Sequence, residues 1–288
     1  PANLRYRRAV AALDSVVEPL IDARAADPDP PDDFFTTLVQ GMQQGTIDRR
    51  MVRDQAITFL FAGHETTSNA LCWSLHLLSA DTAVQEAARE EVRAVTPGAV
   101  PDTDSLARLP YVRAVFEEAM RLYPPIYAMQ RRPREDVEIA GYPVPAGSGI
   151  AISPYVTHRH PDFWTEPDRF RPDRFLDREA EGDARFSYFP FGAGPRTCIG
   201  ADLAMMEGVT ILAMILDRFR VSPEPGRRVE RANLISMTPH GGLPLRLARI
   251  VAPVDGCAPV SLGSGQEPRI GVRGRQPAAR CSPIGQGL

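Results

Sequence analysis

Apolar residues recur with the three- to four-residue spacing of an amphipathic helix over much of the chain. These patterns predict helices over residues 4–25, 34–44, 51–80 and 111–122, and a further helix that begins near Ala201. Prolines follow the first and the fourth pattern, where the backbone restrictions of proline are expected to end a helix. The sequence therefore predicts a mainly α-helical chain.

Residues 137–152 follow a different pattern. Apolar and polar positions alternate there and the chain turns at Gly141 and Gly147, which predicts a small antiparallel hairpin. Residues 161–189 are rich in proline, charge and aromatic rings without a steady period, so we expect an irregular, packed segment. The predicted fold class is mainly α with small antiparallel β hairpins.

The composition of the chain limits the kinds of function and partner that we expect for it. With 288 residues, of which 43% are hydrophobic, the chain can bury a substantial core. A formal net charge of −3 gives no reason to expect nucleic acid as a partner, and no apolar stretch approaches a membrane span. We divide the chain into a folded domain, 1–250, and a Gly/Pro/Arg-rich tail, 251–288, which is expected to be disordered. The 4 cysteines show no framework spacing, which predicts a reducing compartment, the cytoplasm.

One cysteine stands in a glycine-rich loop directly before the last predicted helix. Residues 191–200 read Phe-Gly-Ala-Gly-Pro-Arg-Thr-Cys-Ile-Gly. A thiol that ligates a metal must be held as the anion, which backbone N–H donors, a nearby cation and the positive end of a helix dipole favour. Gly194 lets the backbone approach and Arg196 supplies charge, so Cys198 is a candidate metal thiolate. The residues alone leave open a buried free cysteine in a turn.

A polar block interrupts the apolar pattern of the helix predicted over 51–80. It reads Ala-Gly-His-Glu-Thr-Thr over residues 62–67. Glycine inside a helix loses about 1 kcal/mol against alanine, and Thr66 can donate to the carbonyl of Ala62 and loosen the helix. A mid-helix distortion of this kind often marks function. Polar residues that simply face solvent or another helix are the alternative.

The cysteine run matches the Phe-x-x-Gly-x-Arg-x-Cys-x-Gly signature of the cytochrome P450 family, and the polar block resembles the oxygen-groove segment of that family. The resemblance covers residues 1–249. It implies the cytochrome P450 fold and heme b (iron protoporphyrin IX) as cofactor, with a cysteine thiolate on the iron. Family members normally carry a long N-terminal portion before the oxygen-groove helix, so the resemblance implies an N-terminally truncated fold.

The predicted helix over 111–122 carries Glu118 and Arg121. Their spacing puts both side chains on one face, where such pairs are common surface features. They resemble the Glu-x-x-Arg pair of the family, which an arginine of a later Pro-x-Arg-Phe segment joins, here Arg174. The resemblance implies that the three side chains form a buried charged network that fixes the heme-binding loop.

The same resemblance assigns roles to single residues. Cys198 is implied to be the iron ligand, Thr66 a donor to dioxygen and Glu65 a residue of the proton-delivery path. Arg131 and Arg196 are implied to pair with heme propionates and His158 to make a second contact of that kind, although Arg131 and His158 could be ordinary solvated side chains. The other residues implied to lie beside the heme are Phe191, Gly192 and Ala62. The residues implied to line the substrate pocket are Phe59, Ala62, Ile126, Ile235 and Ser236.

The resemblance implies a heme-dependent monooxygenase that inserts one oxygen atom of O2 into a lipophilic small molecule. No flavin or ferredoxin domain is fused, so a separate ferredoxin or flavodoxin-type protein is expected to supply electrons. Two alternatives stay open: a truncated, non-catalytic fragment of such an enzyme, and a peroxide-dependent heme-thiolate enzyme. Glu65 and Thr66 speak against the peroxide route, because their implied task is to handle O2 and protons.

Overall fold

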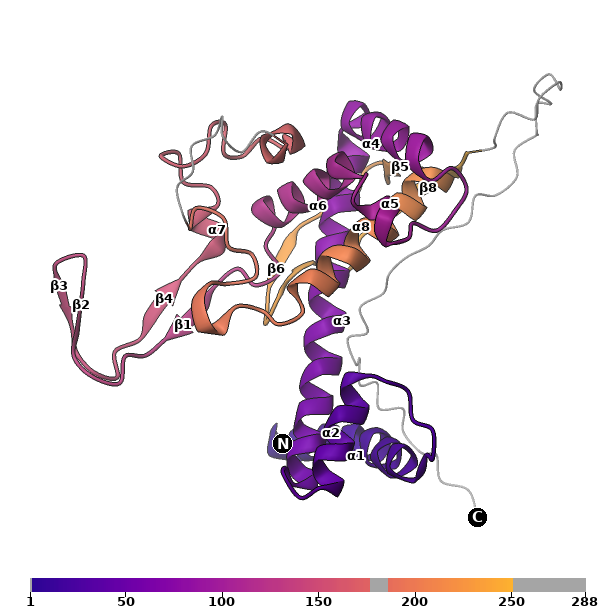
Figure 1. Cartoon of the computed structure of the whole chain (residues 1–288). Helices are drawn as coiled ribbons and strands as arrows, with labels where there is room; N and C mark the ends of the chain where they lie inside the picture. The colour runs from indigo at the N-terminus through magenta and orange to yellow at the C-terminus, as the bar shows by residue number, and fades with distance from the viewer. Residues whose placement is uncertain (1, 177–185, 251–288) are drawn as a thin grey trace, which may run out of the picture. The chain divides into compact units, whose positions relative to one another are not determined.

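The computed structural model describes residues 2–176 and 186–250, so the tail predicted over 251–288 lies outside the described residues. Helices predominate and the strands are short, which confirms the prediction of a mainly α fold with small antiparallel β hairpins (Figure 1). The structure divides into two compact units, Pro1–Thr66 and Thr67–Leu288. The boundary between the units falls within the long helix α3 (Arg49–Ala80).

The first unit contains α1 (Ala2–Ala26), α2 (Phe34–Gln43) and the first part of α3. Helix α2 begins where a polar side chain caps it: the carboxylate of Asp33 accepts a hydrogen bond from Thr36 N at 2.7 Å. Both helices agree with the predicted ranges to within two residues at each end. The buried core of this unit consists of Val17, Ile21, Val39 and Val52.

In the second unit, α4 (Thr82–Val95), α6 (Pro110–Leu122) and α8 (Ala201–Arg218) pack against one another (Figure 1). The closest approach is at Gly208 of α8, where an added Cβ would lie 2.3 Å from Cζ of the buried Phe116 ring. A glycine is therefore required for α8 to pack this closely on α6. The core also includes Leu78, Val92, Leu109, Val112, Val115, Leu212 and Leu216.

The segment over 137–152 does not form a single hairpin. A tight hairpin turns at Ala140 and Gly141, whose φ values of 50° and 83° are both positive, and the last three residues pair elsewhere. The strands of the described residues form four two-stranded antiparallel sheets. The paired strands are β1 (Met129–Arg131) with β4 (Ile150–Ile152), β2 (Val137–Ile139) with β3 (Tyr142–Val144), β5 (Phe219–Pro223) with β8 (Leu245–Arg249), and β6 (Arg231–Asn233) with β7 (Met237–Pro239).

Short helical turns complete the described chain. They are α5 (Thr103–Leu106), α7 (Pro154–Thr157) and the 3-10 turns η1 (Pro172–Phe175) and η2 (Gly194–Arg196). Over residues 2–176 and 186–250, none of the helices combines the length and the hydropathy that crossing a bilayer requires.

Three buried charges form a network near the end of α6. The guanidinium of Arg121 donates to the two carboxylate oxygens of Glu118 at 2.7 and 2.9 Å, and Nε of Arg174 donates to Glu118 at 3.2 Å. All three side chains are fully buried, and both guanidinium groups stack against the ring of Trp164. The structure therefore brings together the three residues that the sequence assigned to one network.

Backbone hydrogen bonds connect this network to the loop of Cys198. Arg121 Nη1 donates to the carbonyl of His158 at 2.7 Å. The ring Nε2 of His158 accepts a hydrogen bond from Phe189 N at 2.9 Å, and the carbonyl of Phe189 accepts one from Gly192 N at 3.0 Å. The position of the cysteine loop is thus coupled to buried charges that lie far away in the sequence.

The imidazole of His158 accepts a hydrogen bond from a backbone N–H, so Nε2 must be unprotonated. Burial, and secondarily the charge of Arg121, lowers the pKa of His158 from 6.5 to about 3. The ring is completely enclosed and lies 5.1 and 5.2 Å from the rings of Tyr188 and Phe189. At neutral pH His158 is therefore an uncharged acceptor in the core.

We expect Gly208→Ala to lower the free energy of unfolding by about 1–3 kcal/mol, because the added methyl group overlaps a buried ring that cannot move without displacing the core. Urea unfolding followed by circular dichroism measures this change. Gly63→Ala is the matched control: Gly63 is also helical, but a Cβ there meets nothing within 4 Å, so its stability should stay equal or rise. Equal effects of the two substitutions would contradict the packing described for Gly208.

We expect His158→Gln to flatten the dependence of stability on pH. The folded-state pKa of about 3 lies below the ordinary value of 6.5, so between these values the unfolded chain binds more protons. The stabilisation from neutral His158 is therefore complete above pH 6.5 and is lost as the pH falls toward 3. Urea unfolding at several pH values should show a steeper decline for the wild type than for the variant. The exposed His240, changed to Gln, is the control; parallel profiles for wild type and His158→Gln would refute the acceptor role.

Candidate functional site

Cys198 lies at the end of a glycine-rich loop that its own backbone closes. Cys198 N donates to the carbonyl of Phe191 at 2.9 Å. Gly192 and Gly194 have φ values of 76° and 72°, a left-handed conformation that residues with a side chain rarely adopt. The thiol is exposed, and none of the described residues forms a hydrogen bond with it. The loop is therefore shaped to present this sulfur outward.

Helix α8 begins directly after the loop, as the sequence predicts. Gly200 is its N-cap and provides no side-chain cap for the first turn. A Cβ at Gly200 would lie 3.9 Å from the sulfur of Cys198, so glycine also keeps the space beside the thiol open. The uncapped N–H groups and the positive end of the helix dipole therefore lie directly beside the cysteine loop.

Two exposed arginines close to the loop have no acidic partner within the described part of the chain. Arg196 lies in η2 and its side chain forms no hydrogen bond or ion pair with the described residues. Arg131, at the end of β1, donates to the carbonyl of its neighbour Gln130 at 2.9 Å. Strand β1 lies beside the loop, because Met129 Cε is 4.0 Å from the Cβ position of Gly192. Both guanidinium groups are available to carboxylates of a ligand.

Apolar side chains near the thiol are also exposed. Leu203 and Met206 are three residues apart and share one face of α8, and Ile199 follows the cysteine directly. Phe191, at the start of the loop, packs instead against the buried core of the second unit. An exposed apolar surface of this kind commonly marks a site that binds a ligand or a partner.

These donors fit an iron porphyrin. A porphyrin iron accepts a thiolate ligand, its two carboxylates match free guanidinium groups, and its ring matches exposed apolar side chains. Cys198, Arg131 and Arg196 supply the first two kinds of contact. The residues present at the loop are therefore those that such a group requires.

The structure does not place His158 among these exposed groups. Its ring is enclosed in the core and its Nε2 accepts from Phe189 N, so its remaining donor, Nδ1–H, is buried and is not presented to a carboxylate of a ligand at the exposed loop. The physical reason is burial, which keeps the imidazole neutral and makes it an acceptor. We replace the expected propionate contact of His158 with a positioning role for the cysteine loop.

The polar block of α3 contains the predicted catalytic residues. Thr66 Oγ1 donates to the carbonyl of Ala62 at 2.8 Å, which confirms the predicted back-bonding. The helix nevertheless continues as α-helix through residues 62–67, so this hydrogen bond does not interrupt it. Glu65 and Thr66 are both half-buried.

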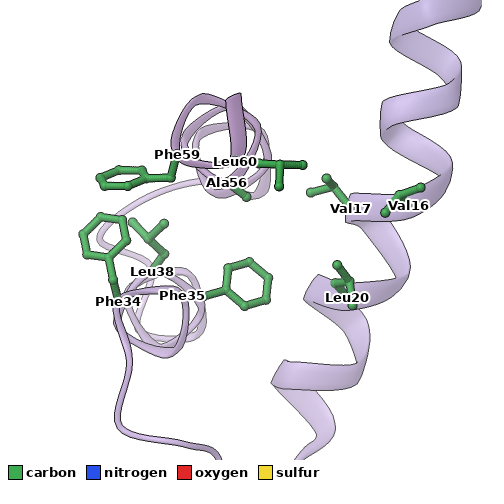
Figure 2. Close-up of a pocket in the computed structure, with 9 residues that line it drawn as sticks. All are labelled: Val16, Val17, Leu20, Phe34, Phe35, Leu38, Ala56, Phe59 and Leu60. Atoms are coloured by element: carbon green, nitrogen blue, oxygen red, sulfur yellow. The ribbon is translucent and has the colours of Figure 1, made fainter. Parts of the chain in front are cut away.

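Phe59 belongs to an apolar groove within the first unit (Figure 2). Its ring centroid lies 4.3 Å from that of Phe34, and the groove has a volume of about 230 Å³. Phe59 therefore has a protein partner in this structure, which the sequence did not predict. The other lining residues are Val16, Val17, Leu20, Phe35, Leu38, Ala56 and Leu60.

The remaining predicted substrate residues lie in the second unit. Ile126 is half-buried after the two prolines that end α6. Ile235 is exposed in the connection between β6 and β7, whereas Ser236 is buried and accepts a hydrogen bond from Asn69 Nδ2 at 2.9 Å. Sequence reasoning missed Asn69. The one feature that could have indicated it is its position as a polar residue one helical turn after Thr66.

Comparisons with known proteins identify the family of the chain. The cytochrome P450 family model matches residues 1–243. Cyclooctatin synthase of Streptomyces melanosporofaciens is 37% identical over 241 residues, which cover 82% of this chain and 52% of that protein. Pentalenene oxygenase of Streptomyces avermitilis is 34% identical over 249 residues, which cover 86% of this chain and 56% of that protein.

Solved structures give the same result. The crystal structure of a cytochrome P450 (CYP102L1) matches with a TM-score of 0.76 and 32% sequence identity, covering 85% of this chain and 58% of that chain. The chain thus spans about half the length of the curated relatives it matches. A cysteine loop of this geometry and a family match over 1–243 lead to one conclusion: the chain belongs to the cytochrome P450 family, whose members use heme as cofactor.

Proposed function

We propose that the protein is a heme-dependent monooxygenase. It inserts one oxygen atom of O2 into a lipophilic small molecule and releases the other as water, with two electrons from a separate redox protein and two protons from solvent. The observation that carries this proposal is the exposed thiol of Cys198, held by a closed glycine loop at the uncapped start of α8.

The bound heme supplies O2 activation and electron transfer, and the chain supplies its binding and orientation. Cys198 would bind the iron through its sulfur, at the end of the loop that directly precedes the N-terminus of α8. Arg131 and Arg196 would bind the two heme carboxylates and Gly192 would lie beside the ring, whereas Phe191, which packs on the core of the second unit, would support the loop.

Thr66 and Glu65 handle protons on α3. The hydroxyl of Thr66 donates to Ala62 O, and rotation about its Cβ–Oγ bond turns the same proton toward an oxygen of the reactant. Glu65, one residue earlier and half-buried, would relay protons from solvent toward Thr66 through water, because adjacent side chains of a helix do not face each other.

The relatives support a lipophilic substrate. The names of pentalenene oxygenase and of a further relative, the cyclooctat-9-en-7-ol 5-monooxygenase of Streptomyces melanosporofaciens, state activity on an unsaturated hydrocarbon and on an unsaturated alcohol. The expected pocket residues of this chain, Phe59, Ile126 and Ile235, are apolar as well. We further propose a ferredoxin or flavodoxin-type electron donor, and a reducing compartment, the cytoplasm, for the free thiols of Cys72 and Cys198.

We expect Cys198→Ser to abolish the red-shifted Soret band that the heme-loaded, dithionite-reduced chain forms with carbon monoxide, because the serine oxygen cannot replace the thiolate ligand. Absorption spectroscopy measures the band. Cys72→Ser is the control: burial raises the pKa of the Cys72 thiol, so this substitution should leave the band intact. A band that survives in Cys198→Ser would refute the assigned ligand. No band in the wild type would favour a non-catalytic fragment.

We expect Thr66→Ala to keep the carbon monoxide band but to lower product formed per NADH oxidised by about 100-fold, since a proton donor is removed while the thiolate stays. Turnover with a ferredoxin, its reductase and pentalenene as probe substrate measures product and hydrogen peroxide. Thr58→Ala is the matched control, because Thr58 Oγ1 also donates to a carbonyl four residues earlier, that of Asp54. Product formed only with added hydrogen peroxide would instead favour the peroxide-dependent enzyme.

A further inference from the structure

The hairpin of β6 and β7 presents an apolar tip. Asn233 and Met237 pair across the hairpin, and three residues connect them. Leu234 and Ile235 are 68% and 75% exposed, whereas Ser236 is only 1% exposed. Two large apolar side chains therefore project from a loop whose third residue points into the protein.

The backbone of this loop is held from both sides. Trp73 Nε1 on α3 donates to Met237 O at 3.0 Å, and Met237 N donates to Pro125 O at 2.8 Å. On the other side of the tip, the hydroxyl of Tyr127 donates to Leu234 O at 2.9 Å. Water can satisfy the backbone of a short exposed loop, so hydrogen bonds to the protein on both sides of this tip indicate that its position matters.

A further hydrogen bond reaches the side chain of the third loop residue. Asn69 Nδ2 donates to Ser236 Oγ at 2.9 Å, and both side chains are buried. Removing the Ser236 hydroxyl leaves the buried amide of Asn69 without this acceptor. Asn69 lies one helical turn after Thr66 and one turn before Trp73 on α3, so one helix supplies hydrogen bonds to two successive hairpin residues.

We propose that Asn69 is a positioning residue that acts through Ser236 to fix the Leu234–Ile235 tip, and that it thereby sets the length of apolar ligand that the site accepts. The inference rests on the proposed function, in which Ile235 contacts the substrate. The affinity of an apolar ligand long enough to contact Ile235 depends on the position of the tip, and that of a ligand too short to contact Ile235 does not. Loss of the tether therefore changes the preference between ligand lengths rather than binding as a whole.

Hydrogen–deuterium exchange tests the tether in the whole chain, with or without heme. In Asn69→Ala and in Ser236→Ala, the amides of Leu234 and Met237 should exchange about 3- to 10-fold faster than in the wild type. The double variant Asn69→Ala/Ser236→Ala, which removes both ends of this hydrogen bond, should show the same increase as the single variants and not their product. Asn233→Ala, an exposed asparagine of the same hairpin, is the control and should change nothing. Unchanged exchange in the Asn69 variant overturns the inference.

Ligand length is tested with the heme-loaded chain by spectral titration with 1-butylimidazole and 1-decylimidazole. In Asn69→Ala the ratio of the two Kd values should change by about 3- to 10-fold, mainly through the longer probe, whereas general destabilisation would weaken both alike. The double variant should match the single one. An unchanged ratio overturns the selectivity role. A wild-type chain without the thiolate spectrum would contradict the proposed function, and hydrogen–deuterium exchange would then decide the tether by itself.

Discussion

The hydrogen bond from Phe189 N to the ring of His158 is the link on which the geometry of the cysteine loop depends. On one side of it, the carbonyl of His158 binds Arg121, whose charge is balanced by buried carboxylate. On the other side, Phe189 binds Gly192 N and thereby holds the loop that ends at Cys198. Hydrogen bonds in a buried network of this kind polarise and strengthen one another. The position of an exposed thiol is thus determined by side chains that never contact it.

Helix α3 has a comparable role for the other functional groups. Its 32 residues form one continuous helix, which includes the back-bonded turn at Thr66. Within two turns after Thr66, the same helix carries Asn69 and Trp73, which hold the β6–β7 hairpin. In the second unit, side chains of this helix therefore hold a hairpin through hydrogen bonds that span 167 and 164 residues of the chain.

Local signals explain what the sequence could predict. The φ > 0 glycines around Cys198, the prolines that end α6 and the short spacing between Glu118 and Arg121 are all visible within a few residues. The role of His158 was not visible, because its partner lies 31 residues away and burial reverses the expected behaviour of the imidazole from donor to acceptor. The bond of Asn69 spans 167 residues, and no periodicity or motif encodes such a contact.

The buried network around Glu118 and the exposed surface at the cysteine loop differ in how many of their polar groups have a partner within the described residues. Around Glu118, buried charges are paired and hydrogen-bonded to backbone carbonyls, as a low-dielectric interior requires. At the cysteine loop, by contrast, the guanidinium groups of Arg131 and Arg196 lack a carboxylate partner among the described residues, and apolar side chains of α8 are exposed. Such groups gain most from a ligand that is both apolar and dianionic, because it satisfies each kind at once. The combination of guanidinium groups without a carboxylate partner and exposed apolar side chains, more than the cysteine alone, explains why this face of the second unit suits a porphyrin.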